Sequence, residues 1–180
     1  MNEKPRSADQ RLRRRRTLHD DFAGWLRKNR SRLPMRLLVR QRRGDGVRDY
    51  RFPDAPDFRV LVDNRGIEVR VVHEGEVFDT LIDLDIEPRR DAAGYYCAWC
   101  EDQGHAERFP DRATLLAQHA FEPFAEWCRE MLRADKRLVM ERNPCGSTTA
   151  SICDARDVRR RKPPGVTMYV VKPVLCGSTA

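Results

Sequence analysis

At 180 residues, with 40% hydrophobic and 35% charged content, the chain is long enough for one domain with a core, but too polar for all of it to be buried. It has no apolar run as long as a membrane span and no apolar N-terminal signal segment, which excludes an integral helical membrane protein and favours the cytoplasm. In a reducing compartment, its six cysteines are expected to be thiols or metal ligands rather than disulfides.

The formal net charge of +7 is unevenly distributed along the chain. Residues 1–51 carry 17 Lys and Arg against 6 Asp and Glu, residues 52–140 carry 11 against 19, and residues 141–180 carry 7 against 3. An acidic middle is thus flanked by basic ends. Such asymmetry indicates either an arm that binds a polyanion or a tail that folds back onto an acidic body.

Residues 1–33 are interpreted as a basic N-terminal helix or arm. Apolar side chains recur at helical spacing near its end, which predicts a helix over residues 7–30 with Ser7 as the N-cap. The first half of this helix has little apolar surface to bury. Its basic side chains are the predicted nucleic-acid-binding residues, because a few phosphate contacts give useful non-specific affinity: Arg11, Arg13, Arg14, Arg15 and Arg16.

Residues 34–141 are predicted to form a single α+β domain with an antiparallel sheet. Alternating apolar residues between turn signals predict strands over residues 37–42, 47–52, 58–63, 67–73 and 76–86. In the last strand, the apolar even-numbered positions are expected on one face, and Asp79, Asp83 and Asp85 on the other.

A zinc-knuckle and helical module is expected over residues 95–133, at the C-terminal end of the sheet. Asp111 is predicted to cap a helix that ends near Phe121, and Pro123 is predicted to begin a second one. A short strand is expected over 137–141. Residues 142–180 are rich in proline and basic residues and are interpreted as a basic, partly disordered tail with one strand at 166–172.

The segment YYCAWCEDQGHAERFPDRATLLAQH, residues 95–119, carries the most specific motif. Cys97 and Cys100 have the Cys-x2-Cys spacing of a zinc knuckle, in which two thiolates hold one face of a tetrahedral ion. Histidines rather than further cysteines follow, which favours zinc over an iron–sulfur cluster. With Phe109, Leu116 and His119, the segment resembles the C2H2-type zinc fingers. The resemblance implies a cysteine hairpin packed on a helix that presents a histidine to the metal.

The fourth metal ligand is less well defined by the sequence, because no second histidine follows His119 closely. His105 in the loop is the favoured candidate. Cys128 lies nine residues beyond His119, about 13.5 Å along a continuous helix, so it would require a sharp bend at Pro123. Water or a carboxylate is the remaining alternative. The predicted metal site is therefore Cys97, Cys100, His105 and His119.

The zinc is expected to be structural, since no glutamate stands beside a histidine in a hydrolase pattern. Residues 95–128 hold six acidic and only two basic residues, so this module is not expected to bind DNA itself. The favoured hypothesis is a small zinc-binding accessory protein, not an enzyme, that associates with nucleic acid through its basic arm. The alternatives are an adaptor that presents an acidic zinc-stabilised face to a protein partner, or a metal-dependent nuclease that uses the row Asp79, Asp83, Asp85 and Glu87.

Overall fold

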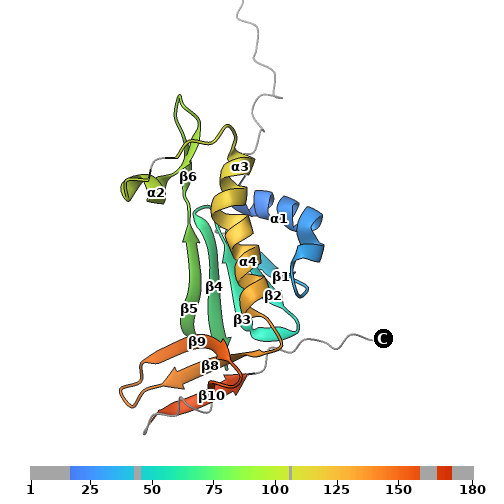
Figure 1. Cartoon of the computed structure of the whole chain (residues 1–180), viewed down its shortest axis with the longest axis vertical. Helices are drawn as coiled ribbons and strands as arrows, with labels where there is room; N and C mark the ends of the chain where they lie inside the picture. The colour runs from blue at the N-terminus through green and yellow to red at the C-terminus, as the bar shows by residue number, and fades with distance from the viewer. Residues whose placement is uncertain (1–16, 43–45, 106, 159–165, 172–180) are drawn as a thin grey trace, which may run out of the picture.

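The protein has the mixed α+β organisation that the sequence predicts (Figure 1). The structure, a computed structural model, describes residues 17–42, 46–105, 107–158 and 166–171. Its larger sheet is an antiparallel meander in the order β1-β2-β3-β4-β5. The strands are β1 (Leu38–Arg42), β2 (Arg48–Phe52), β3 (Ala55–Val62), β4 (Gly66–His73) and β5 (Glu76–Asp85). All five expected strands are present within one or a few residues of their predicted bounds.

The strict alternation predicted for β5 is wrong, because β5 contains two irregularities opposite β4. These change which face each side chain occupies. Thr80 pairs with Arg70 on the outer face, where its hydroxyl donates to Glu68 at 2.9 Å. Asp79 pairs with the buried Val71, so it does not share the outer face with Asp83 and Asp85. The acidic row is therefore divided between the two faces.

The first described helix, α1 (Leu18–Asn29), begins later than the sequence pattern predicts. Thr17 is the N-cap, and it forms a capping box with Asp20 in which each residue accepts a backbone N–H of the other. The described helix therefore begins at Leu18, and the predicted cap Ser7 lies outside the described residues. The arginines at 11 and 13–16 lie outside the described residues. A short 3-10 turn, η2 (Arg30–Arg32), ends the segment.

The second half of the chain contributes one long helix where the sequence predicts two. The segments α3 (Arg112–Leu116), η3 (Ala117–Phe121) and α4 (Glu122–Met131) follow one another without a break, and η3 is a π-helical turn. Pro123 has no N–H to donate to the carbonyl of His119, its partner in an ordinary α-helix. The wider π-turn, in which Glu122 N donates to the carbonyl of Ala117, accommodates this defect without a sharp bend.

A second sheet, in the order β10-β8-β9, packs against the N-terminal end of β5 (Figure 1). Its strands are β8 (Lys136–Arg142), β9 (Thr148–Asp154) and β10 (Thr167–Val171). The sequence predicts β8 and β10 but misses β9, which it assigns to the partly disordered tail. β9 is fixed to β5 by two side-chain bonds: Thr148 Oγ1 donates to the Phe78 carbonyl at 2.9 Å, and Ala150 N donates to Asp79 Oδ2 at 2.8 Å.

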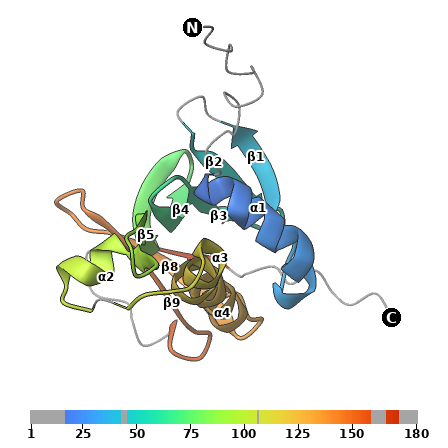
Figure 2. The same cartoon turned by 90° about the horizontal axis from the view of Figure 1, so that it is seen from above.

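The core lies between the larger sheet and the helices α1 and α3–α4, which cover the same face of that sheet (Figure 2). Phe22 of α1 is fully buried at their meeting point. Its ring contacts Tyr50 of β2 edge-on at 5.3 Å and Phe124 of α4 at 5.5 Å. Among the described residues, none of the helices combines the length and the apolar character that crossing a membrane requires.

Replacing Phe22 with alanine is expected to lower the free energy of unfolding by about 3–5 kcal/mol, because it leaves a cavity where two helices and the sheet meet. Urea denaturation followed by circular dichroism measures this loss. Val77→Ala, at a position that is 50% exposed on β5, is the control and should change stability by no more than about 0.5 kcal/mol. Equal effects of the two substitutions would contradict this view of the core.

Candidate metal centre

A small hairpin projects from the end of β5 and carries the cysteines. It consists of β6 (Pro88–Arg90) and β7 (Tyr95–Cys97), followed directly by the short helix α2 (Ala98–Asp102). Asp91 shapes its turn by accepting hydrogen bonds from the backbone N–H groups of Ala93 and Gly94, at 2.8 and 3.0 Å. The hairpin thus places Cys97 at the end of a strand and at the start of a helix.

Phe109 connects the hairpin to the segment that leads into α3. Its backbone forms two hydrogen bonds with Tyr95, of 2.9 and 2.8 Å. Gly94 has φ of +141°, and a Cβ at this position would lie 2.5 Å from the Phe109 carbonyl oxygen. Only glycine therefore allows the two backbones to approach this closely. The Phe109 side chain is buried and fills the space between the hairpin and the helix.

The first two donor atoms come from the start of α2. Cys97 is the N-cap, and its Sγ accepts a hydrogen bond from the backbone N–H of Cys100 at 3.3 Å. This bond to sulfur brings the two thiols to the same side of the turn. It also offsets part of the negative charge that a thiolate would carry. Cys97 is 4% exposed, and Cys100 is half-buried.

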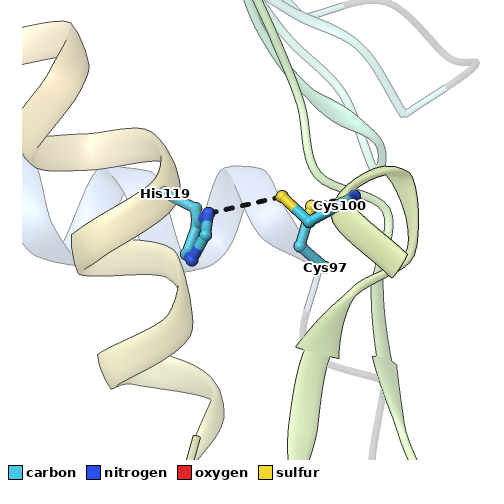
Figure 3. A group of neighbouring side chains, drawn as sticks. All are labelled: Cys97, Cys100 and His119. Carbon is cyan, nitrogen blue, oxygen red and sulfur yellow. Dashed lines mark hydrogen bonds between the residues drawn. The ribbon is translucent and has the colours of Figure 1, made fainter. Parts of the chain in front are cut away.

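The third donor is His119, which the π-turn η3 presents toward the cysteines (Figure 3). Its Nδ1 lies 3.7 Å from Cys100 Sγ, and its ring packs edge-on against Phe109 at 5.2 Å. The ligand atoms of Cys97, Cys100 and His119 all lie within 4.8 Å of one another. Donors around a tetrahedral zinc ion are about 3.4–3.8 Å apart. A small inward movement would therefore let these three groups hold a metal ion.

In the metal-free protein, the surroundings of Cys100 suppress the ionisation of its thiol. Burial, together with the hydrogen bond and charge of Cys97, raises the pKa of the Cys100 thiol to about 11. Cys100 is then protonated at neutral pH when no cation is present. A bound metal ion must displace this proton, so its affinity should rise with pH.

A hollow of about 400 Å³ opens beside the three donors. Its wall includes all three, and also Asp83, Asp85 and Trp99. A fourth ligand, such as water, can therefore reach an ion held by this group. Trp99 is 54% exposed although it stands between the two cysteines. Trp99 belongs to the predicted motif, but Asp83 and Asp85 are not predicted at the metal group, because only the packing of β5 beside α2 brings them there.

The structure does not bring either predicted fourth ligand into this group. His105 is exposed in the loop after α2. Cys128 is fully buried farther along the same continuous helix, where burial raises its pKa. Within the part of the chain that the structure describes, one group of three or more histidine, cysteine or acidic side chains could hold a metal ion. This group is Cys97, Cys100 and His119.

Among the described residues, the acidic row of Asp79, Asp83, Asp85 and Glu87 does not form a second metal site. Asp85 pairs with Arg65 at 2.7 Å, and Glu87 pairs with Arg89 at 2.7 Å. Asp79 accepts its hydrogen bond from β9 on the other face. The carboxylates that a nuclease would need are therefore separated or occupied by arginine.

The two cysteines thus lie at the end of a hairpin and the histidine lies on a helix, and together they form a possible metal-binding group. In comparisons with protein-family models, with curated proteins and with solved structures, no family, protein or structure matches the chain. The possible metal site therefore depends on the geometry of these residues alone.

Purified protein is expected to bind about one metal ion per chain, and Cys97→Ser, Cys100→Ser or His119→Ala should abolish tight binding. Cobalt titration measures this directly, because thiolate-to-cobalt charge transfer gives an absorption band that each cysteine variant should weaken. Cys145→Ser and His105→Ala are the matched controls, since both residues are exposed and outside the group. Loss of the ion in a control but not in the three variants would exclude this site.

Proposed function

We propose that the chain binds one zinc ion at Cys97, Cys100 and His119, and that this zinc has a structural role. The donor set of two thiolates and one imidazole suits zinc. It joins the α2 end of the hairpin to the middle of the long helix, beside Phe109, which bonds to Tyr95 and packs on His119. Water completes the coordination from the side of the hollow.

We further propose that the protein is an accessory factor that associates with nucleic acid through its basic arm, Arg11 and Arg13–Arg16. The observation that supports this proposal is the distribution of charged residues along the chain. Of the 35 Lys and Arg, 13 lie outside the described residues, against 3 of the 28 Asp and Glu. The described body therefore carries 22 basic and 25 acidic residues, so the positive excess belongs to the flanking segments.

Many arginines of the body are already paired with carboxylates. Arg32 pairs with Glu122, Arg59 with the buried Asp49, and Arg112 with Asp21. Such pairs neutralise the body locally, and its 22 basic and 25 acidic residues give it a small net charge. A body of this kind neither attracts a polyanion strongly by itself nor offers a large acidic surface to hold the arm. This balance favours an arm that is available to phosphates.

A protein adaptor is the second candidate, and the position of Trp99 favours it. An exposed tryptophan beside Asp83 is the kind of aromatic anchor that protein interfaces use. Trp99→Ala would abolish binding to a protein partner but would leave a nucleic-acid complex that depends on the arm unchanged.

Removal of zinc is expected to lower the melting temperature. Free zinc at 100 times its Kd stabilises a protein by about 2.7 kcal/mol, which corresponds to roughly 5–10 °C for a chain of this size. Differential scanning calorimetry with and without a chelator measures the shift. Cys97→Ser should melt at the lower temperature and show no further response to the chelator. An unchanged melting temperature of a protein shown to have lost its zinc would exclude the structural role.

Replacing Arg11 and Arg13–Arg16 with glutamine should weaken nucleic-acid binding and reduce its dependence on salt. Five lost phosphate contacts would lower the slope of log K against log salt by up to about 4.5 on duplex DNA. Substitution is preferable to deletion because Thr17, the next residue, caps α1. Glutamine replacement of Arg159–Arg161 and Lys162 is the control. No binding by the intact protein at low salt would exclude this function.

A further inference from the structure

The proposed zinc site has three protein donors and one open coordination position. The ligand atoms of Cys97, Cys100 and His119 lie within 4.8 Å of one another, and no other described cysteine, histidine or acidic residue belongs to this group. The hollow of about 400 Å³ borders all three donors, so the remaining position of a tetrahedral ion can be reached from it. Zinc ions with three protein donors and an open position commonly bind an external ligand there.

The other histidines of the chain do not fill this position. Of the four histidines, His119 is itself a donor. His19 is buried in α1, and His73 is hydrogen-bonded to Asp57 at the end of β4. His105 is exposed in the loop after α2, outside the donor group. A second imidazole at the metal would therefore come from another molecule.

The charges around the hollow oppose an anionic ligand. A zinc ion bound by two thiolates and one neutral imidazole has no net charge, so it does not attract an anion strongly by itself. The described residues that line the hollow include Asp83 and Asp85 but no lysine or arginine. Asp85 is paired with Arg65, whereas the exposed Asp83 forms no ion pair with any described residue. A carboxylate or thiolate ligand would be repelled by Asp83, and a ligand that donates a hydrogen bond would be favoured.

An imidazole is the donor that fits this combination. At neutral pH it is largely unprotonated, so a ring nitrogen can bind zinc without first losing a proton, whereas an aliphatic amine is protonated at this pH. The other ring nitrogen carries a hydrogen, and metal-bound imidazoles usually donate this hydrogen to a carboxylate or a carbonyl oxygen. Asp83 is such an acceptor on the wall of the hollow, and the exposed ring of Trp99 adds an aromatic surface.

We infer that the zinc site binds an imidazole from another molecule in this hollow, with one ring nitrogen on the metal and the N–H of the other donated to Asp83. The inference rests on the proposed zinc site and assigns a ligand to its open position. Binding is a ligand exchange in which the imidazole displaces the zinc-bound water, so no proton is released. A histidine side chain of a partner protein and a small imidazole compound share this chemistry.

The test uses the full chain with cobalt in place of zinc, because the d–d absorption of cobalt changes with its ligands. Free imidazole should shift these bands in a saturable way and leave the thiolate-to-cobalt absorption in place. Azide, a small anionic nitrogen donor, should bind about tenfold more weakly, because Asp83 repels it. A glycine–histidine–glycine tripeptide with blocked ends is the third probe. If it binds more tightly than free imidazole, the natural ligand is a protein side chain, and if it binds more weakly, the ligand is a small compound.

Asp83→Asn removes the charge of the wall with little change of shape. It should weaken imidazole binding by about tenfold, as the loss of a partner of a metal-bound imidazole does, and it should strengthen azide binding. Asp102→Asn is the matched control, because Asp102 is exposed on α2 beside the cysteines but does not line the hollow. It should change neither affinity. Cobalt content and circular dichroism confirm that each variant folds and holds the metal.

His105→Ala removes the one exposed histidine of the chain and should leave the imidazole titration unchanged. Tighter binding of imidazole by this variant would show that His105, from the same chain or from a second copy, occupies the open position. That result would overturn the inference.

The remaining outcomes separate this inference from the proposed zinc site. If the protein takes up neither cobalt nor zinc, the proposed zinc site fails, and the inference fails with it. If cobalt binds tightly but imidazole leaves its d–d bands unchanged, the inference is overturned while the zinc site stands. Equal affinities for imidazole and azide also overturn it, because the hollow would then not select its ligand by charge. This comparison needs no variant, so it remains decisive if Asp83→Asn does not fold.

Discussion

The close approach of Gly94 and Phe109 is the constraint on which the functional end of the molecule depends. The hairpin of β6 and β7 is too short to bury a core of its own, and only three residues of each strand pair. The two hydrogen bonds between Tyr95 and Phe109 add a third segment to it. The buried Phe109 ring then packs against His119, which sets the distance between the cysteines and the long helix. Without this packing, the three donors would belong to two independent parts of the chain.

The sequence is sufficient to predict the meander and most of the donor group, because both depend on local patterns. Alternating residues between turn signals predict β3, β4 and β5, and the Cys-x2-Cys spacing with a helical histidine predicts three donors. The features that the sequence does not predict depend on tertiary contacts between distant segments. The bulges in β5 arise in its pairing with β4, and the position of His105 outside the donor group depends on how α2 ends. The pairing of β9 with β8 is a tertiary contact that no local pattern shows, so the sequence assigns β9 to a tail whose proline and basic residues predict partial disorder.

Pro123 shows how one local signal can be interpreted in two ways. Proline after a helical segment usually indicates that the helix ends, which is why the sequence predicts two helices there. The structure instead inserts a π-turn one residue ahead of the proline and continues the helix. The same turn contains His119. A π-turn changes the direction of the side chains on it relative to a regular helix. The proline four residues after the histidine therefore helps to direct the imidazole toward the cysteines.

The proposed zinc ion has a thermodynamic consequence for the hairpin. If zinc joins Cys97 and Cys100 to His119, the ribbon of β6 and β7 cannot separate from the long helix without loss of the ion, so zinc binding stabilises their packing. The Cys100 thiol is protonated at neutral pH when no cation is bound, so a metal ion must displace this proton. The stabilisation by zinc should therefore increase as the pH rises.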